Sequence, residues 1–158
     1  MKELLLVSIG SFFGGGMRFW ISKMVQSYTF IVFPFGTMTV NVLGCLIIGF
    51  LSGLNWNGGG LLSPSVKMLL TTGFCGGFTT FSTFMNEGYG LMKDGSYTYM
   101  MLYLFGSLAL GLLAVLAGHY LAKCIAWKEG NPHMRKECIC IIEKKKIYHF
   151  YYFIHKMG

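Results

Sequence analysis

Apolar residues occur in long runs along the first 123 positions, and short polar or turn-forming segments separate the runs. The runs cover residues 4–24, 33–54, 66–92 and 97–122. Because about 20 apolar residues in a helix cross a hydrocarbon core of about 30 Å, each run predicts a membrane-spanning helix. We therefore predict an all-α membrane protein with four transmembrane helices joined antiparallel by short loops.

The composition favours the same class. Hydrophobic residues make up 54% of the 158 residues and charged residues only 12%, more apolar surface than a soluble domain of this length can bury. The apolar run after Lys2 continues through glycines without a small-residue cleavage site, so it predicts a first span rather than a removable signal sequence. The expected location is the cell (plasma) membrane, with several passes.

The formal net charge of +7 comes mainly from the C-terminal segment, residues 124–158, which holds seven of the 13 Lys and Arg residues. Basic residues beside a span more often contact lipid headgroups than nucleic acid, so nucleic acid is not an expected partner. We predict two parts: a four-helix transmembrane domain over residues 1–123, and a basic, aromatic tail over residues 124–158 to which we assign no structure or function.

Basic residues in the transmembrane domain are balanced between the two sides of the predicted bundle. They are Lys2, Lys67 and Lys123 on one side, and Arg18, Lys23 and Lys93 on the other. The positive-inside rule then gives no preferred orientation, and oppositely inserted copies can pack as an antiparallel, dual-topology homodimer. The basic tail, if it is counted, would instead hold both termini inside, so the sequence leaves both arrangements open.

Glycines recur at a spacing that brings helices close together. The pairs are Gly10 and Gly14, Gly49 and Gly53, and Gly73 and Gly77. In membranes such small-residue faces let backbones approach, so each pair predicts a tight helix contact.

The third run contains the segment GFCGGFTTFSTF, residues 73–84. Each glycine in a helix costs about 1 kcal/mol relative to alanine, so the cluster of Gly73, Gly76 and Gly77 predicts a third helix that is broken in mid-membrane. Irregular backbone at that depth requires protein or a water-filled cavity around it. Its freed carbonyls are candidate ligands for a cation.

Aromatic and hydroxyl side chains follow the predicted break. Phe81 and Phe84 lie one turn apart on one helical face. The hydroxyls around the same turn are those of Thr79, Thr80, Ser82 and Thr83. One such hydroxyl usually bonds a carbonyl of the preceding turn. Four beside two phenyl rings favour instead a polar pathway.

Two further polar positions lie in the second and fourth spans. Asn41 is at the middle of the second, with Thr37 one turn before it, and Ser107 lies in the fourth. The two N–H donors of Asn41 could face a pore or bond a neighbouring helix, and Ser107 alone indicates packing. Neutral donors and the positive edges of phenyl rings can replace water around a small anion and still release it.

Three segments resemble the signature regions of the Fluc (CrcB) family of fluoride channels. They are GSFFGGGMRF at 10–19, PFGTMTVNVLG at 34–44 and GFCGGFTTFSTF at 73–84. The resemblance extends over residues 2–123, with mild departures at Ser11, Gly15 and Phe19, and the tail has no counterpart in the family pattern.

The resemblance implies a fluoride-selective channel that lets fluoride leave the cytoplasm passively, and not an enzyme. It also implies a dual-topology homodimer with two pores and a central sodium ion, held by the carbonyls of Gly76 and Thr79 from both subunits. Arg18 matches the family arginine and would attract anions into a vestibule, although by sequence alone it could snorkel to headgroups. The implied fluoride pathway contains Asn41, Phe81 and Phe84, with Thr37, Ser82, Thr83 and Ser107 as weaker candidates. The implied partners are a second copy, fluoride and membrane lipid.

Two other classes of protein have similar size and composition. A four-helix, proton-coupled exporter of cationic compounds needs an intramembrane carboxylate, and Glu87, which we expect near the interface, is the only acidic residue in a predicted span. A thiol oxidoreductase would use Cys45 or Cys75, but no CxxC pair or mid-membrane His accompanies either. A purely structural subunit would not need a broken helix lined with hydroxyls.

Overall fold

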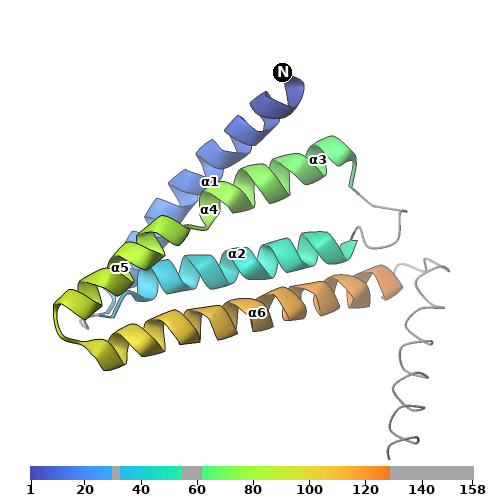
Figure 1. Cartoon of the computed structure of the whole chain (residues 1–158). Helices are drawn as coiled ribbons and strands as arrows, with labels where there is room; N and C mark the ends of the chain where they lie inside the picture. Colours follow the sequence, from blue (N-terminus) through green and yellow to red (C-terminus); the bar gives the residue numbers. More distant parts are fainter. Residues whose placement is uncertain (30–32, 55–61, 129–158) are drawn as a thin grey trace, which may run out of the picture. The chain divides into compact units, whose positions relative to one another are not determined.

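The structure, a computed structural model, describes residues 1–29, 33–54 and 62–128, and every regular element among them is a helix (Figure 1). The elements are α1 (Lys2–Ser27), α2 (Phe35–Leu54), α3 (Pro64–Met68), η1 (Leu69–Cys75), α4 (Gly76–Phe78), α5 (Phe81–Lys93) and α6 (Tyr97–Lys128). The chain divides into the units Met1–Ala122 and Lys123–Gly158. From residue 129 onward, the predicted tail lies outside the described residues.

Three of these helices are long and apolar enough to cross a membrane: Lys2–Ser27, Phe35–Leu54 and the part of α6 from Tyr97 to Ile125. They coincide with the first, second and fourth apolar runs of the sequence, which confirms an all-α protein with membrane-spanning helices. The third run, residues 66–92, is divided among α3, η1, α4 and α5.

Local sequence signals determine where several helices begin and end. Ser63 caps α3 by accepting a hydrogen bond from the Val66 amide at 3.4 Å, and proline follows it at the first helical position. At the other end of this region, the amide of Gly95 donates to the Met92 carbonyl and that of Ser96 to the Leu91 carbonyl. This Schellman pattern needs a left-handed residue, and Gly95 has a φ of 71°. The turn directs the chain from α5 into α6.

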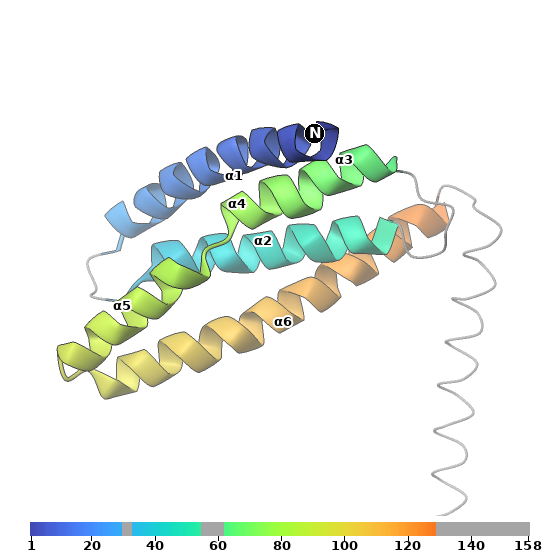
Figure 2. The same ribbon diagram turned by 45° about the horizontal axis from the view of Figure 1, so that its top comes forward.

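The third apolar run changes its helical form twice. From Pro64 the chain continues without interruption through α3, the π-helical stretch η1 and α4 (Figure 2). Thr79 and Thr80 then adopt extended conformations, with φ/ψ of −86°/157° and −146°/118°, before α5 begins. The helix is therefore interrupted at two threonines rather than at the preceding glycines, which stay helical. β-Branched residues favour extended backbone more than other side chains do.

Gly73 of η1 and Gly77 of α4 pack against α1. A Cβ added at Gly10 would lie 2.8 Å from the Cα atom of Gly73, and one added at Gly77 would lie 2.8 Å from the Cα atom of Ser11. Such approaches are possible only where at least one of the two facing residues has no side chain, so the predicted close contact is confirmed for these two glycine pairs.

The third glycine pair, Gly49 and Gly53, allows a similarly close contact between α2 and α6. A Cβ at Gly49 would lie 2.8 Å from the Cα atom of Val115, and one at Gly53 would lie 2.6 Å from the Cβ atom of Ala122. The interface between α2 and α6 is thus built on absent side chains.

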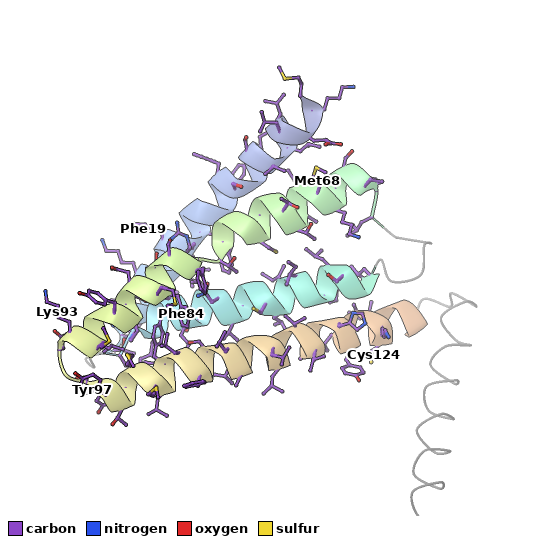
Figure 3. All side chains as sticks on the ribbon, viewed as in Figure 1. Phe19, Met68, Phe84, Lys93, Tyr97 and Cys124 are labelled. Atoms are coloured by element: carbon purple, nitrogen blue, oxygen red, sulfur yellow. The ribbon has the colours of Figure 1, made fainter. Side chains whose placement is uncertain are left out.

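The buried core is small and lies where α5 passes α2 and α6. Phe84, Leu91 and Tyr103 form its centre, and Figure 3 shows Phe84 among the surrounding side chains. Many large apolar side chains on the outer faces are exposed, among them Phe12 at 78% and Phe19 at 67%. In lipid such faces need no protein cover, because hydrocarbon takes the place of water.

Candidate functional site

A groove of about 500 Å³ lies between α2, the interrupted run and α6. It collects six of the residues that the sequence singles out: Asn41, Gly76, Thr79, Phe81, Phe84 and Ser107. Thr37, Ser82, Thr83 and Arg18 are not among its lining residues. The groove therefore joins the interruption to the polar positions of two neighbouring helices.

The side-chain amide of Asn41 is bonded at both ends to the main chain of Thr80. Its Nδ2 donates to the Thr80 carbonyl at 3.1 Å, and the Thr80 amide donates to its Oδ1 at 2.8 Å. This pairing, like that of two β-strands, requires Thr80 to be outside a helix. The sequence left open whether Asn41 faces a pore or bonds a neighbouring helix. In the structure Asn41 bonds a neighbouring segment, and it also lines the groove.

Gly44 lets α2 come close enough for this pairing. A Cβ at position 44 would lie 3.3 Å from Cδ1 of Phe78 and would collide with Cγ2 of Thr79. Because position 44 follows Asn41 by about one turn, any larger residue there would move the amide away from Thr80.

Side chains of α1 bind carbonyls of the interrupted run. The Ser11 hydroxyl donates to the Gly73 carbonyl at 3.2 Å, and Nε of Arg18 donates to the Gly77 carbonyl at 3.2 Å. In an unbroken helix the Gly77 carbonyl would accept from the amide of Phe81, which the interruption removes. Arg18 is half-buried and replaces that donor. The vestibule role of Arg18 stays a prediction.

Two other carbonyls at the interruption have no such donor. The amide of Thr80, which would reach Gly76 in an unbroken helix, bonds Asn41 instead, and the amide of Thr83 bonds the Thr80 hydroxyl at 3.4 Å. Among the side-chain hydrogen bonds and the backbone hydrogen bonds outside helices that the described residues make, none reaches the carbonyl oxygens of Gly76 or Thr79. Neutral, unpartnered carbonyls suit a hard cation, so these two residues fit the sodium site that the family resemblance implies.

The hydroxyls after the interruption have different partners. Thr79 Oγ1 donates to the Cys75 carbonyl at 2.9 Å, the bond to the preceding turn that a single hydroxyl was expected to make. Thr80 Oγ1 donates to Thr83 Oγ1 at 3.0 Å, and Ser82 is exposed. Ser107 Oγ, on α6, is buried in the groove without a partner among the described residues. It remains a hydroxyl that can donate to a ligand.

The two phenyl rings lie beside each other with different exposure. Their centroids are 6.1 Å apart at an interplanar angle of 43°, Phe84 is 5% exposed and Phe81 73%. One ring therefore belongs to the core while the other stands open at the groove.

Sequence reasoning missed the hydrogen bonds of Glu87, which lies one turn after Phe84 on α5. Glu87 is half-buried, and its carboxylate accepts hydrogen bonds of 2.8 Å from the hydroxyls of Thr37 and Tyr103. Tyr103 is fully buried. Glu87 therefore faces the neighbouring helices, and its expected place near the membrane interface stays a prediction. A signal was present, because Glu87 follows Phe84 by one turn and so shares its inward face of α5.

Comparison with known proteins places this arrangement in a family. Residues 5–119 match the family model described as CrcB-like protein, Camphor Resistance (CrcB). The chain belongs to the CrcB-like family. As a CrcB-like protein with several apolar helices long enough to cross a membrane, it is a multi-pass membrane protein.

Curated relatives of this CrcB-like chain bear the name fluoride-specific ion channel FluC. The protein from Chlorobaculum tepidum is 50% identical over 123 residues, which cover 78% of this chain and 96% of the relative. The protein from Chlorobium chlorochromatii is 46% identical over 124 residues, covering 78% and 95%. One from Bacteroides fragilis strain YCH46 is 43% identical over 126 residues, covering 78% and 98%. The family seen in the three sequence segments is thus confirmed.

Proposed function

We propose that this protein is a fluoride-selective ion channel, not an enzyme, that lets fluoride leave the cytoplasm passively and so lowers its toxicity. The observation that carries the proposal is the groove in which neutral donors lie beside phenyl rings. The unpartnered Ser107 hydroxyl and Asn41 line it together with Phe81 and Phe84. Neutral donors can replace part of the hydration of a small anion and still let it leave. The printed names of the curated relatives support the same function.

The proposed architecture has four spans. The segment from α3 to α5 forms the third, broken at Thr79 and Thr80 in mid-membrane. Support comes from the donors that reach this segment from other helices, since lipid supplies none: Arg18 serves the Gly77 carbonyl and Asn41 serves both polar groups of Thr80. A break with most of its polar groups paired in this way, and with the Gly76 and Thr79 carbonyls left for a cation, is tolerable at bilayer depth.

We further propose that two oppositely oriented copies form a homodimer in the cell (plasma) membrane around a sodium ion. The Gly76 and Thr79 carbonyls would hold the ion. Their lack of hydrogen-bond donors and their position on an open groove support this role. A bound cation would offset negative charge near the anion path and tie together the interrupted segments. The balance of basic residues in the first 123 positions agrees with dual insertion.

The remaining polar residues have secondary roles in this proposal. Thr37, Ser82 and Thr83 would extend the hydroxyl track beyond the groove, and Arg18 would draw anions toward its mouth. The proton-coupled exporter is not proposed, because the relatives are named as fluoride channels and the inward carboxylate of Glu87 is engaged by the hydroxyls of Thr37 and Tyr103.

Ion efflux from liposomes tests the function. The purified protein should release fluoride rapidly without a proton gradient and release chloride far more slowly. Replacing Phe81 by alanine should slow fluoride efflux about tenfold, because the ring edge contributes roughly 1 kcal/mol to a bound anion. Tyr89→Leu is the matched control, since Tyr89 is an exposed aromatic residue of α5 outside the groove. Equal fluoride and chloride efflux, or efflux that needs a proton gradient, would overturn the channel proposal.

A further inference from the structure

Asn41 uses most of its hydrogen-bonding groups on the main chain of Thr80. The 2.8 Å and 3.1 Å bonds engage Oδ1 and one of the two N–H groups of Nδ2. One N–H is left to face the groove, where the sequence had suggested two. This distribution is unusual for a residue that serves only as a donor to an ion, and it points to a second role.

We infer that Asn41 is a positioning residue that keeps the helix open at Thr79 and Thr80, so that the carbonyls of Gly76 and Thr79 stay free for a cation. The inference rests on the proposed function for the identity of the cation as sodium. The pairing itself rests on the two hydrogen bonds and on the conformation of Thr80.

The Thr80 amide has two possible hydrogen-bond acceptors, the Gly76 carbonyl and Asn41 Oδ1. In a continuous α-helix this N–H would donate to the carbonyl of Gly76, four residues earlier. Asn41 Oδ1 takes the N–H away and so leaves the Gly76 oxygen without a donor. Without the Asn41 amide, the nearest available acceptor for the Thr80 N–H in the same segment is that Gly76 carbonyl. Whether the Gly76 oxygen can bind a cation therefore depends on which group accepts the hydrogen bond from the Thr80 N–H.

The surroundings of Asn41 are suited to this role. Val40 beside it is fully buried, so the turn that carries Asn41 is fixed in the interior. Gly44 removes the side chain that would hold α2 away from Thr79. Asn and Gln have a donor and an acceptor that point the same way from one uncharged planar group, and the shorter of the two spans this gap with fewer rotatable bonds.

A solid-state NMR titration tests the inference without measuring transport. The sequence has two Thr–Thr pairs, at 71–72 and 79–80. Labelling threonine with carbonyl ¹³C and amide ¹⁵N therefore yields two sequential signals, of which Thr79–Thr80 reports the interruption and Thr71–Thr72 serves as an internal reference. Protein in lipid bilayers is titrated with sodium chloride against N-methyl-glucamine chloride at constant ionic strength. In the unsubstituted protein the Thr79 carbonyl signal should move with sodium, and the Thr71 signal should stay fixed.

Asn41→Leu keeps the size of the side chain and removes both hydrogen bonds. The sodium concentration at the midpoint should rise about 10-fold or more, the effect of losing two hydrogen bonds of ordinary net strength. The Thr79 carbonyl signal without sodium should also move toward the helical range. Cys45→Ser is the matched control, because Cys45 lines the same groove one turn later on α2, and its midpoint should be unchanged.

Three outcomes would overturn the inference. They are an unchanged midpoint in Asn41→Leu, an equal shift in Cys45→Ser, and no effect of sodium on the Thr79 signal of the unsubstituted protein. If Asn41→Leu does not fold, Gly44→Ala replaces it: Asn41 is kept but α2 is pushed from Thr79, and the midpoint should rise by a smaller factor. Loss of fluoride selectivity in the efflux assay together with the expected titration would reject the proposed function and leave the positioning role in place.

Discussion

Replacing Gly14 by alanine is expected to destabilise the protein by about 3 kcal/mol, through overpacking and the loss of two helix-to-helix hydrogen bonds. The new methyl group would collide with the Phe74 carbonyl and lie 2.9 Å from the Phe78 amide nitrogen, both main-chain atoms that cannot rotate away. α1 would have to withdraw from η1 and α4. The hydrogen bonds of Ser11 to Gly73 and of Arg18 to Gly77 would then lengthen or break.

Gly16→Ala is the control for this experiment, on the same helix two residues later. A Cβ at Gly16 meets no atom within 4 Å. Because alanine is also the better helix former, the control should be neutral or stabilising by up to about 1 kcal/mol. The measurement is the thermal unfolding of both variants in the same detergent. Equal melting temperatures for Gly14→Ala and Gly16→Ala would contradict the close contact between α1 and the interrupted run.

Replacing Glu87 by leucine is expected to destabilise the protein by about 2–4 kcal/mol. The change leaves two buried hydroxyls, those of Thr37 and Tyr103, without their present acceptor, and each such loss costs about 1–3 kcal/mol. Thr37 is 3% exposed and Tyr103 0%, so water cannot easily replace the carboxylate.

Glu87→Gln separates the hydrogen bonds from the charge. The glutamine oxygen can accept from one hydroxyl, and its NH₂ group can donate to the other if that hydroxyl turns. We therefore expect Glu87→Gln to keep most of the stability that Glu87→Leu loses, as judged by the unfolding midpoint at neutral pH. If both variants unfold at the same temperature, the stabilising factor is the charge of Glu87 and not its two acceptor oxygens.

Much of the fold could be predicted from hydropathy, because in lipid each apolar run of sufficient length must satisfy its own backbone as a helix. The runs at 4–24, 33–54 and 97–122 correspond to α1, α2 and α6. Most ends of these helices lie within a few residues of the ends of the runs. The glycine pairs were also informative. A glycine lets two helix backbones approach more closely than a residue with a side chain does.

The details of the site depended on contacts between helices that are distant in the sequence. The glycine cluster led us to expect a break at those residues, yet Gly73 and Gly77 pack against α1 in helical conformation, and the extended residues are Thr79 and Thr80. Similarly, nothing in the sequence linked Arg18 to the Gly77 carbonyl, 59 positions away. The inward position of Glu87 could be inferred only by extending the face of Phe84 by one turn.

The π-helical stretch η1 has a consequence for how this chain tolerates insertions and deletions. Each residue of an ordinary helix rotates the next by about 100°, and a π-helical turn carries one residue more than an α-helical turn. Removing a single residue between Leu69 and Cys75 would thus let the segment tighten into α-helical form. Because the deletion takes up the extra residue of the π-helical turn, everything that follows would keep nearly its present direction about the helix axis. Gly77 would still face α1 and Thr80 would still face Asn41, whereas the same deletion in an ordinary α-helix would turn every later residue by about 100°.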